Sequence, residues 1–80
     1  QDFPVMIYPN PAHDELEIKL PDTEELTEVE VIDLSGKVQL TESFRRGGEH
    51  SLDISRLPTA VYLLSWRSGD YSGSLKFEKR

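Results

Sequence analysis

The fold of this 80-residue chain is decided by residues 61–78, which read VYLLSWRSGDYSGSLKFE. Gly69-Asp70 is the two-residue centre of a tight β-hairpin between two runs that alternate apolar and polar residues. This register places one set of apolar side chains on a single face, which we expect to be the core face: Tyr62, Leu64, Trp66, Leu75 and Phe77. A slip of one residue would bury Lys76 and expose Trp66. The need to bury the apolar face therefore supports the two-residue turn at Gly69-Asp70.

The rest of the chain also alternates with period two, and no window shows the spacing of an amphipathic helix over three turns. Phe3–Tyr8 is predicted to be a first strand, ended by Pro9-Asn10-Pro11 because neither proline can donate a backbone hydrogen bond. Leu16–Leu20 alternates leucine and isoleucine with charged residues, which predicts a strand with one buried face. Asp33-Leu34-Ser35-Gly36 fits a type I turn with Gly36 at positive φ, so a bulged hairpin is expected there.

Further strands are indicated by short apolar series: Val29 and Val31, then Val38, Leu40 and Phe44, then Leu52 and Ile54. Leu57-Pro58 reads as a corner between the last of these and the final hairpin. About seven short strands with turn signals between them favour two packed sheets, because one sheet of this size would leave its apolar face wet. We therefore predict a single all-β domain over residues 1–80, an antiparallel β-sandwich.

Composition excludes several classes of partner. The chain carries nine Lys and Arg against fifteen Asp and Glu, a net charge of −6. Nucleic acid and anionic membrane surfaces both require a basic footprint, so neither is an expected partner. No apolar run approaches the roughly 18–20 residues needed to insert into a bilayer, and the first residues do not resemble a secretory leader. The chain is therefore either a mature form or a part of something longer.

Two histidines, His13 and His50, have acidic neighbours, and acidic residues also crowd the loop after Pro21. Neither group shows the spacing of a zinc or calcium site. We interpret both histidines as solvated loop residues and the loop carboxylates as a solvated rim. No metal and no cofactor are expected.

Catalysis is not expected either. His50-Ser51 and Asp53 fall within one predicted strand, where adjacent side chains point to opposite faces, so they cannot form a local triad. The sequence has no nucleophile elbow and no phosphate-binding glycine loop. A thin sandwich also offers little room for a cleft.

The aromatic residues leave one binding function open. Trp66, Tyr62, Phe77 and Tyr71 would form a sugar-stacking platform if they lay on an exposed sheet. The hairpin register instead places most of them inside, which a chain of this length needs for its core. An adhesion or carbohydrate-binding module of the immunoglobulin-like (Ig-like) type therefore remains the alternative function.

Several segments together resemble one family, the C-terminal sorting domains of type IX secretion cargo (the Por secretion tail family). They are Tyr8–Ala12, the strand Val29–Leu34 entering Ser35-Gly36-Lys37, the corner Leu52–Pro58, Val61–Leu64 and a basic end. The resemblance covers about residues 7 to 80, and the order and spacing of the segments make it specific. Ala60 stands where the family usually has glycine, so the backbone there need not adopt positive φ.

The resemblance implies an Ig-like β-sandwich that acts as an address rather than as an enzyme. It implies an N-terminal cargo domain that is carried across the outer membrane by the type IX secretion machinery, and a sortase-like peptidase that removes the domain. It also implies a secreted or cell-surface location, reached through the periplasm of a Gram-negative bacterium.

The positions that match the family pattern are Pro9, Asn10, Pro11, Gly36, Leu57, Pro58, Tyr62, Lys79 and Arg80. We expect most of them to be structural, with the last strand, Leu75–Arg80, as the segment recognised directly by the machinery. An edge-strand dimer of the isolated domain is a further hypothesis, because an exposed strand edge can pair with a second copy.

Overall fold

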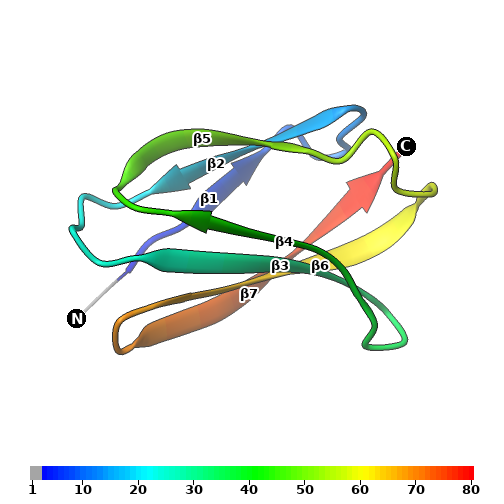
Figure 1. Cartoon of the computed structure of the whole chain (residues 1–80). Helices are drawn as coiled ribbons and strands as arrows, with labels where there is room; N and C mark the ends of the chain where they lie inside the picture. Colours follow the sequence, from blue (N-terminus) through cyan, green and yellow to red (C-terminus); the bar gives the residue numbers. More distant parts are fainter. Residues whose placement is uncertain (1–2) are drawn as a thin grey trace.

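The computed structural model describes residues 3–80, which form two antiparallel sheets packed face to face and contain no helix (Figure 1). One sheet has three strands in the order β1-β2-β5 and the other has four in the order β4-β3-β6-β7. The strands are β1 (Met6–Tyr8), β2 (Glu15–Leu20), β3 (Thr27–Asp33), β4 (Val38–Phe44), β5 (Gly48–Asp53), β6 (Ala60–Ser68) and β7 (Tyr71–Lys79). The predicted all-β sandwich of seven short strands is confirmed. Residues 3–80 accordingly include no helix that could span a membrane.

The β6–β7 hairpin has the predicted register along its whole length, with Tyr62 opposite Phe77 and Ser68 opposite Tyr71. Gly69 has a φ of +57°, and no described residue other than glycine has positive φ. Positive φ at the first central position alone is the mark of a type II′ turn, whose twist matches that of the strands it joins.

The core lies between the sheets and consists of the alternate residues that the sequence assigns to it. Its fully buried side chains come from both layers, and include Leu16, Ile18, Val29, Val31, Tyr62, Leu64 and Phe77. Leu75 lies on the core face as predicted, opposite Leu64, but it is only half-buried. β7 is the edge strand of its sheet, and Leu75 precedes the part of this strand that the segment around Ala12 covers.

Trp66 is held by neighbours from two distant parts of the chain. Its ring centroid lies 5.1 Å from that of Phe3, which in turn stacks on Tyr71 at 5.1 Å. The first strand is shorter than predicted, because residues 3–5 precede β1 and Phe3 packs into this aromatic cluster instead of pairing as strand. Gly73 lies directly opposite Trp66. Its missing side chain gives the indole its space, since a Cβ there would approach Trp66 Cζ2 to 2.7 Å.

A buried polar pair, which the sequence did not reveal, lies at the same end of the hairpin. Thr27 Oγ1 donates a 2.9 Å hydrogen bond to Ser68 Oγ, and both residues are buried. The pair joins the first residue of β3 to the last residue of β6. It thereby satisfies two hydroxyl groups that would otherwise be costly to bury.

The hairpin between β3 and β4 contains the predicted bulge. Its register shifts between Val31, which faces Leu40, and Ile32, which faces Val38. The extra residue is Gln39, and Val38 consequently points outward with 44% of its surface exposed.

We expect Gly73→Val to destabilise the domain by about 1–3 kcal/mol, because the new side chain must displace the Trp66 ring in a close-packed region. Chemical denaturation followed by tryptophan fluorescence measures the change. Ser74→Val is the matched control, since Ser74 lies on the exposed outer face of the same strand. Equal stability of the two variants would contradict the role assigned to Gly73.

Candidate functional site: the C-terminal clasp

The segment after β1 crosses from one sheet to the other. β1 pairs with β2 in the three-stranded sheet, whereas Ala12 forms a parallel bridge with Lys79 at the end of β7. The crossing is made by Pro9-Asn10-Pro11, in which both peptide bonds preceding proline are cis. The N-terminal segment therefore lies against the last residues of the chain.

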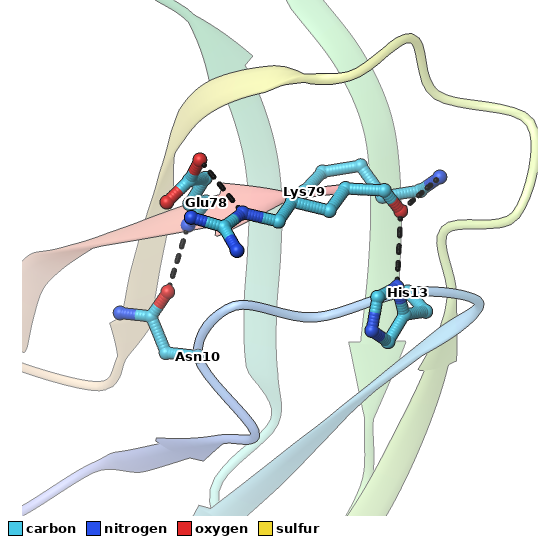
Figure 2. A network of polar contacts seen from close by, with 5 residues as sticks. Asn10, His13, Glu78 and Lys79 are labelled. Carbon is cyan, nitrogen blue, oxygen red and sulfur yellow. Dashed lines mark hydrogen bonds and ion pairs between the residues drawn. The ribbon is translucent and has the colours of Figure 1, made fainter.

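Four hydrogen bonds hold this contact, which we call the C-terminal clasp: Asn10, Ala12 and His13 on one side and residues 78–80 on the other. Figure 2 shows the contacts that the Asn10 and His13 side chains make. Ala12 N donates to the Glu78 carbonyl and Arg80 N donates to the Ala12 carbonyl, both at 2.8 Å. Glu78 N donates to Asn10 Oδ1 at 2.9 Å, and His13 Nδ1 lies 3.3 Å from the backbone oxygen of Arg80. Asn10 is not in a strand, so its backbone does not pair with β7. Its side chain instead accepts the hydrogen bond from the edge of β7 at Glu78.

The two basic residues of the clasp have different environments. Lys79 is 7% exposed and points inward like Phe77, with its ammonium group 3.4 Å from the backbone oxygen of Arg80. Its methylene groups therefore cover the end of the core while the charged group reaches the boundary. Arg80 is exposed and pairs with Glu78 at 3.1 Å, an arrangement that contributes little stability in water.

The turn that contains Gly36 is organised by the carboxylate of Asp33. Asp33 Oδ1 accepts hydrogen bonds from Ser35 Oγ (2.6 Å), Ser35 N (2.9 Å) and Lys37 N (3.0 Å). Gly36 N donates to the Asp33 carbonyl at 3.0 Å, and Gly36 has a φ of +92° as expected. The hydrogen bond from the Ser35 hydroxyl is the main cause that lowers the pKa of Asp33 from 3.8 to about 2, followed by that from the Lys37 amide.

The corner before β6 is fixed by Tyr62. The Tyr62 hydroxyl donates a 2.6 Å hydrogen bond to the Pro58 carbonyl, four residues earlier. Burial, followed by the nearby Asp33 carboxylate, raises the pKa of this hydroxyl, so it remains a proton donor in the neutral range. Leu57 N donates to the Ile54 carbonyl at 3.0 Å, and the Leu57 side chain is buried in the core.

The strand register brings all nine predicted positions to one end of the sandwich. Asp33 lies opposite Tyr62 and Ala60 lies opposite Lys79, so the Gly36 turn, the Pro58 corner and the clasp share this end. Figure 1 shows the C-terminus, the β5–β6 connection and the β3–β4 turn on the same side of the molecule. Three of the nine are buried, namely Leu57, Tyr62 and Lys79, and the other six are exposed.

The aromatic platform considered from the sequence is not formed. Tyr62, Trp66 and Phe77 are 2%, 9% and 1% exposed, which confirms the prediction that they belong to the core. The outer face of the four-stranded sheet has a hollow of about 890 Å³, but polar residues such as Glu28, Ser65 and Ser72 dominate its lining.

The two histidines differ from each other. His13 is exposed within the clasp, whereas His50 lies in β5 and is half-buried. The prediction of a solvated loop residue was wrong for His50, whose ring stacks on Phe44 at 4.2 Å and whose Nε2 donates to the Arg46 carbonyl at 2.9 Å. Ser51 and Asp53 are exposed on the opposite face of β5. Within residues 3–80 no three His, Asp or Glu side chains are grouped so as to hold a metal ion.

A family model described as "Secretion system C-terminal sorting domain" matches residues 6–79. The chain belongs to this family. The sorting domain is therefore a C-terminal signal of type IX secretion, a class that interacts with the secretion machinery and is in general non-catalytic. Proteins that carry it are secreted or cell-surface proteins of Gram-negative bacteria. No curated protein matches the chain.

The sequence of the sorting domain does not by itself predict the hydrogen bonds of the clasp. The only signal for them is an asparagine between two prolines, because the prolines lack the N–H groups that would continue a ladder and leave the asparagine side chain to bond instead. Which strand that side chain meets depends on a contact between residues 68 positions apart.

We expect Asn10→Ala to weaken the clasp, with a loss of about 0.5–1.5 kcal/mol, because the Glu78 amide loses its acceptor. Hydrogen exchange of the Glu78 amide should accelerate, while that of the Leu64 amide in the centre of β6 changes much less. Asn10→Asp is the control because it keeps an acceptor oxygen at the same position. Unchanged exchange at Glu78 in Asn10→Ala would show that the clasp does not depend on this bond.

The lowered pKa of Asp33 predicts a pH dependence for the sorting domain. Its contribution to stability is fully present above the unfolded pKa of 3.8 and is lost as the pH falls through the folded value of about 2. Thermal unfolding should therefore show that the stability difference between wild type and Asp33→Asn shrinks as the pH falls from 5 to 2. Glu30→Gln is the control, as its carboxylate on the outer face of β3 makes none of the described hydrogen bonds. A constant difference over this range would contradict the assignment.

Proposed function

We propose that the sorting domain is a non-catalytic address that directs a cargo protein, attached at its N-terminal side, from the periplasm across the outer membrane. Residues 1–80 act as one domain in this role. The family match over residues 6–79 supports the proposal. The main structural support is that the nine positions that match the family pattern (the pattern positions) all lie at one end of the sandwich.

The orientation of the first strand supports recognition that is independent of the cargo. β1 runs toward the end that holds the clasp, so chain that precedes β1 enters from the opposite end (Figure 1). A cargo attached there lies away from the pattern positions. The same machinery can then read the same surface on unrelated cargo proteins.

The clasp leaves only part of the last strand, β7, available for recognition by backbone pairing. It occupies the backbone groups of Glu78 and Arg80 on the outer edge of β7. Because backbone groups alternate along a strand, those of Ser72, Ser74 and Lys76 point to the same edge, and none of them is bonded to another segment among residues 3–80. This open edge is where we place an added strand, whether from the machinery or, in an isolated edge-strand dimer, from a second copy.

The family resemblance also supports removal of the domain by a sortase-like peptidase after export. That step acts on the junction with the cargo and requires no catalytic group of the sorting domain. The domain does not fit the adhesion or carbohydrate-binding alternative, because the aromatic side chains that such a platform needs are buried.

A fusion experiment tests the proposed function. Residues 1–80 are placed at the C-terminus of an inert reporter that is exported to the periplasm of a type IX-competent bacterium. The reporter is expected in the medium or on the cell surface, and its amount is measured by protease accessibility and fractionation. The same fusion in a strain without a functional type IX system is the control. Retention of the reporter in the periplasm of the competent strain would refute the proposal.

A further inference from the structure

Leu34 is the most exposed of the large hydrophobic residues in the described part of the chain, with 69% of its surface accessible. It lies at the tip of the Asp33–Gly36 turn, whose backbone is fixed by the hydrogen bonds to the Asp33 carboxylate. An apolar side chain on a rigid turn loses little conformational freedom when it is buried by a partner. The turn thus presents Leu34 in a form suited to binding.

A hollow of about 320 Å³ lies beside Leu34. Its other wall is formed by Pro58, Ala60, Val61 and Tyr62. The two polar side chains that line it, Asp33 and Gln39, are bonded to each other at 2.9 Å. The hollow therefore offers mainly apolar walls to an incoming group.

The neighbouring outer face of the four-stranded sheet continues this apolar surface. Ile32 lies directly opposite Val38 on one side and Leu63 on the other, which gives an aliphatic row across three strands. Ile32 and Leu63 point outward because they alternate with the buried Val31 and Leu64, and Val38 lies opposite Ile32 after the bulge. We call Leu34, the hollow and this row the Leu34 patch. Farther along the same face the outward residues are polar, such as Glu28, Glu30 and Arg67.

The distribution of charge indicates what kind of partner surface would bind the Leu34 patch. The half of the sandwich that contains the patch, formed by residues 9–16, 32–39, 52–63 and 76–80, carries five Lys and Arg and five Asp and Glu. The other half is formed by residues 3–8, 17–31, 40–51 and 64–75. It carries four Lys and Arg and nine Asp and Glu. The net negative charge of the described residues thus lies away from the patch. A neutral, apolar surface is complementary to this end, whereas a strongly basic one is complementary to the other.

We propose that the Leu34 patch is a second surface through which the domain docks on the secretion machinery, in addition to the open edge of β7. Its partner is a protein component with a neutral, apolar surface, which receives the Leu34 side chain and places an apolar side chain of its own in the hollow. This inference rests on the proposed function and adds a contact surface to it. The patch lies at the end of the sandwich opposite to the entry of the chain into β1, so an attached cargo does not cover it.

The same reporter fusion, carrying Leu34→Ser, tests the proposal. Export is expected to fall at least tenfold, because the main apolar anchor is lost. The melting temperature of the isolated domain should remain within a few degrees of wild type, because Leu34 is mostly exposed. Leu26→Ser is the matched control, since Leu26 is also an exposed leucine, at 43%, and lies outside the patch. Val38→Ser in the aliphatic row is a second variant, with reduced export expected, in case Leu34→Ser does not fold.

Each outcome is decisive. Wild-type export by Leu34→Ser, or an equal loss in Leu26→Ser, overturns the proposal, as does normal export by Val38→Ser if only that variant folds. Light scattering of the isolated domain tests the competing occupant: a wild-type dimer that Leu34→Ser converts to a monomer would assign the patch to a second copy. Failure of the unmodified fusion to leave the periplasm would instead count against the proposed function itself.

Discussion

The register of the β6–β7 hairpin is the constraint on which the other features depend. It places Trp66 over Gly73, where the indole has space, and brings Tyr62 and Phe77 into the core on the same face. Because side chains alternate along a strand, a shift of one residue would exchange this buried set for one that includes Lys76. The same register sets Ala60 against Lys79, so it also fixes where the end of β7 lies relative to the Pro58 corner. The hairpin register therefore determines both the burial of the aromatic rings and the position of the clasp.

The clasp covers part of the free edge of the same hairpin, along β7. A free edge strand invites pairing with other chains, and natural proteins commonly cover such edges. Here the crossing segment covers the end of β7 with a parallel bridge at Ala12 and a side-chain hydrogen bond from Asn10. Since prolines flank Asn10, this segment cannot itself extend the sheet as a regular strand. The end of β7 is thus closed, while its middle remains available.

The sequence predicted those features that depend on local chemistry or on strict alternation. The Gly69-Asp70 turn, the buried faces of β2 and β3 and the bulged hairpin at Gly36 are of this kind. The sequence did not predict burial or side-chain contacts that depend on the tertiary packing of distant segments. Leu75 lies on the core face as its parity predicts, but its partial exposure depends on which part of the edge strand β7 the segment around Ala12 covers. His50 has the parity of Leu52, yet its place beside Phe44 depends on how the two sheets meet. The partners of Asn10 and Thr27 are distant in the chain and leave no periodic signal.

The pattern positions and the exposed apolar residues at this end of the sandwich have separate roles. Most of the pattern positions are engaged within the domain: Tyr62 bonds the Pro58 carbonyl, Asn10 bonds the Glu78 amide and Gly36 completes the Asp33 turn. They fix the shape of one end of the sandwich, whereas Leu34 and Val38 supply its exposed apolar side chains. In the docking that we propose, a partner that binds this end needs apolar groups in fixed positions more than it needs particular residues. The surface side chains can then vary in identity as long as the internal bonds hold their backbone in place.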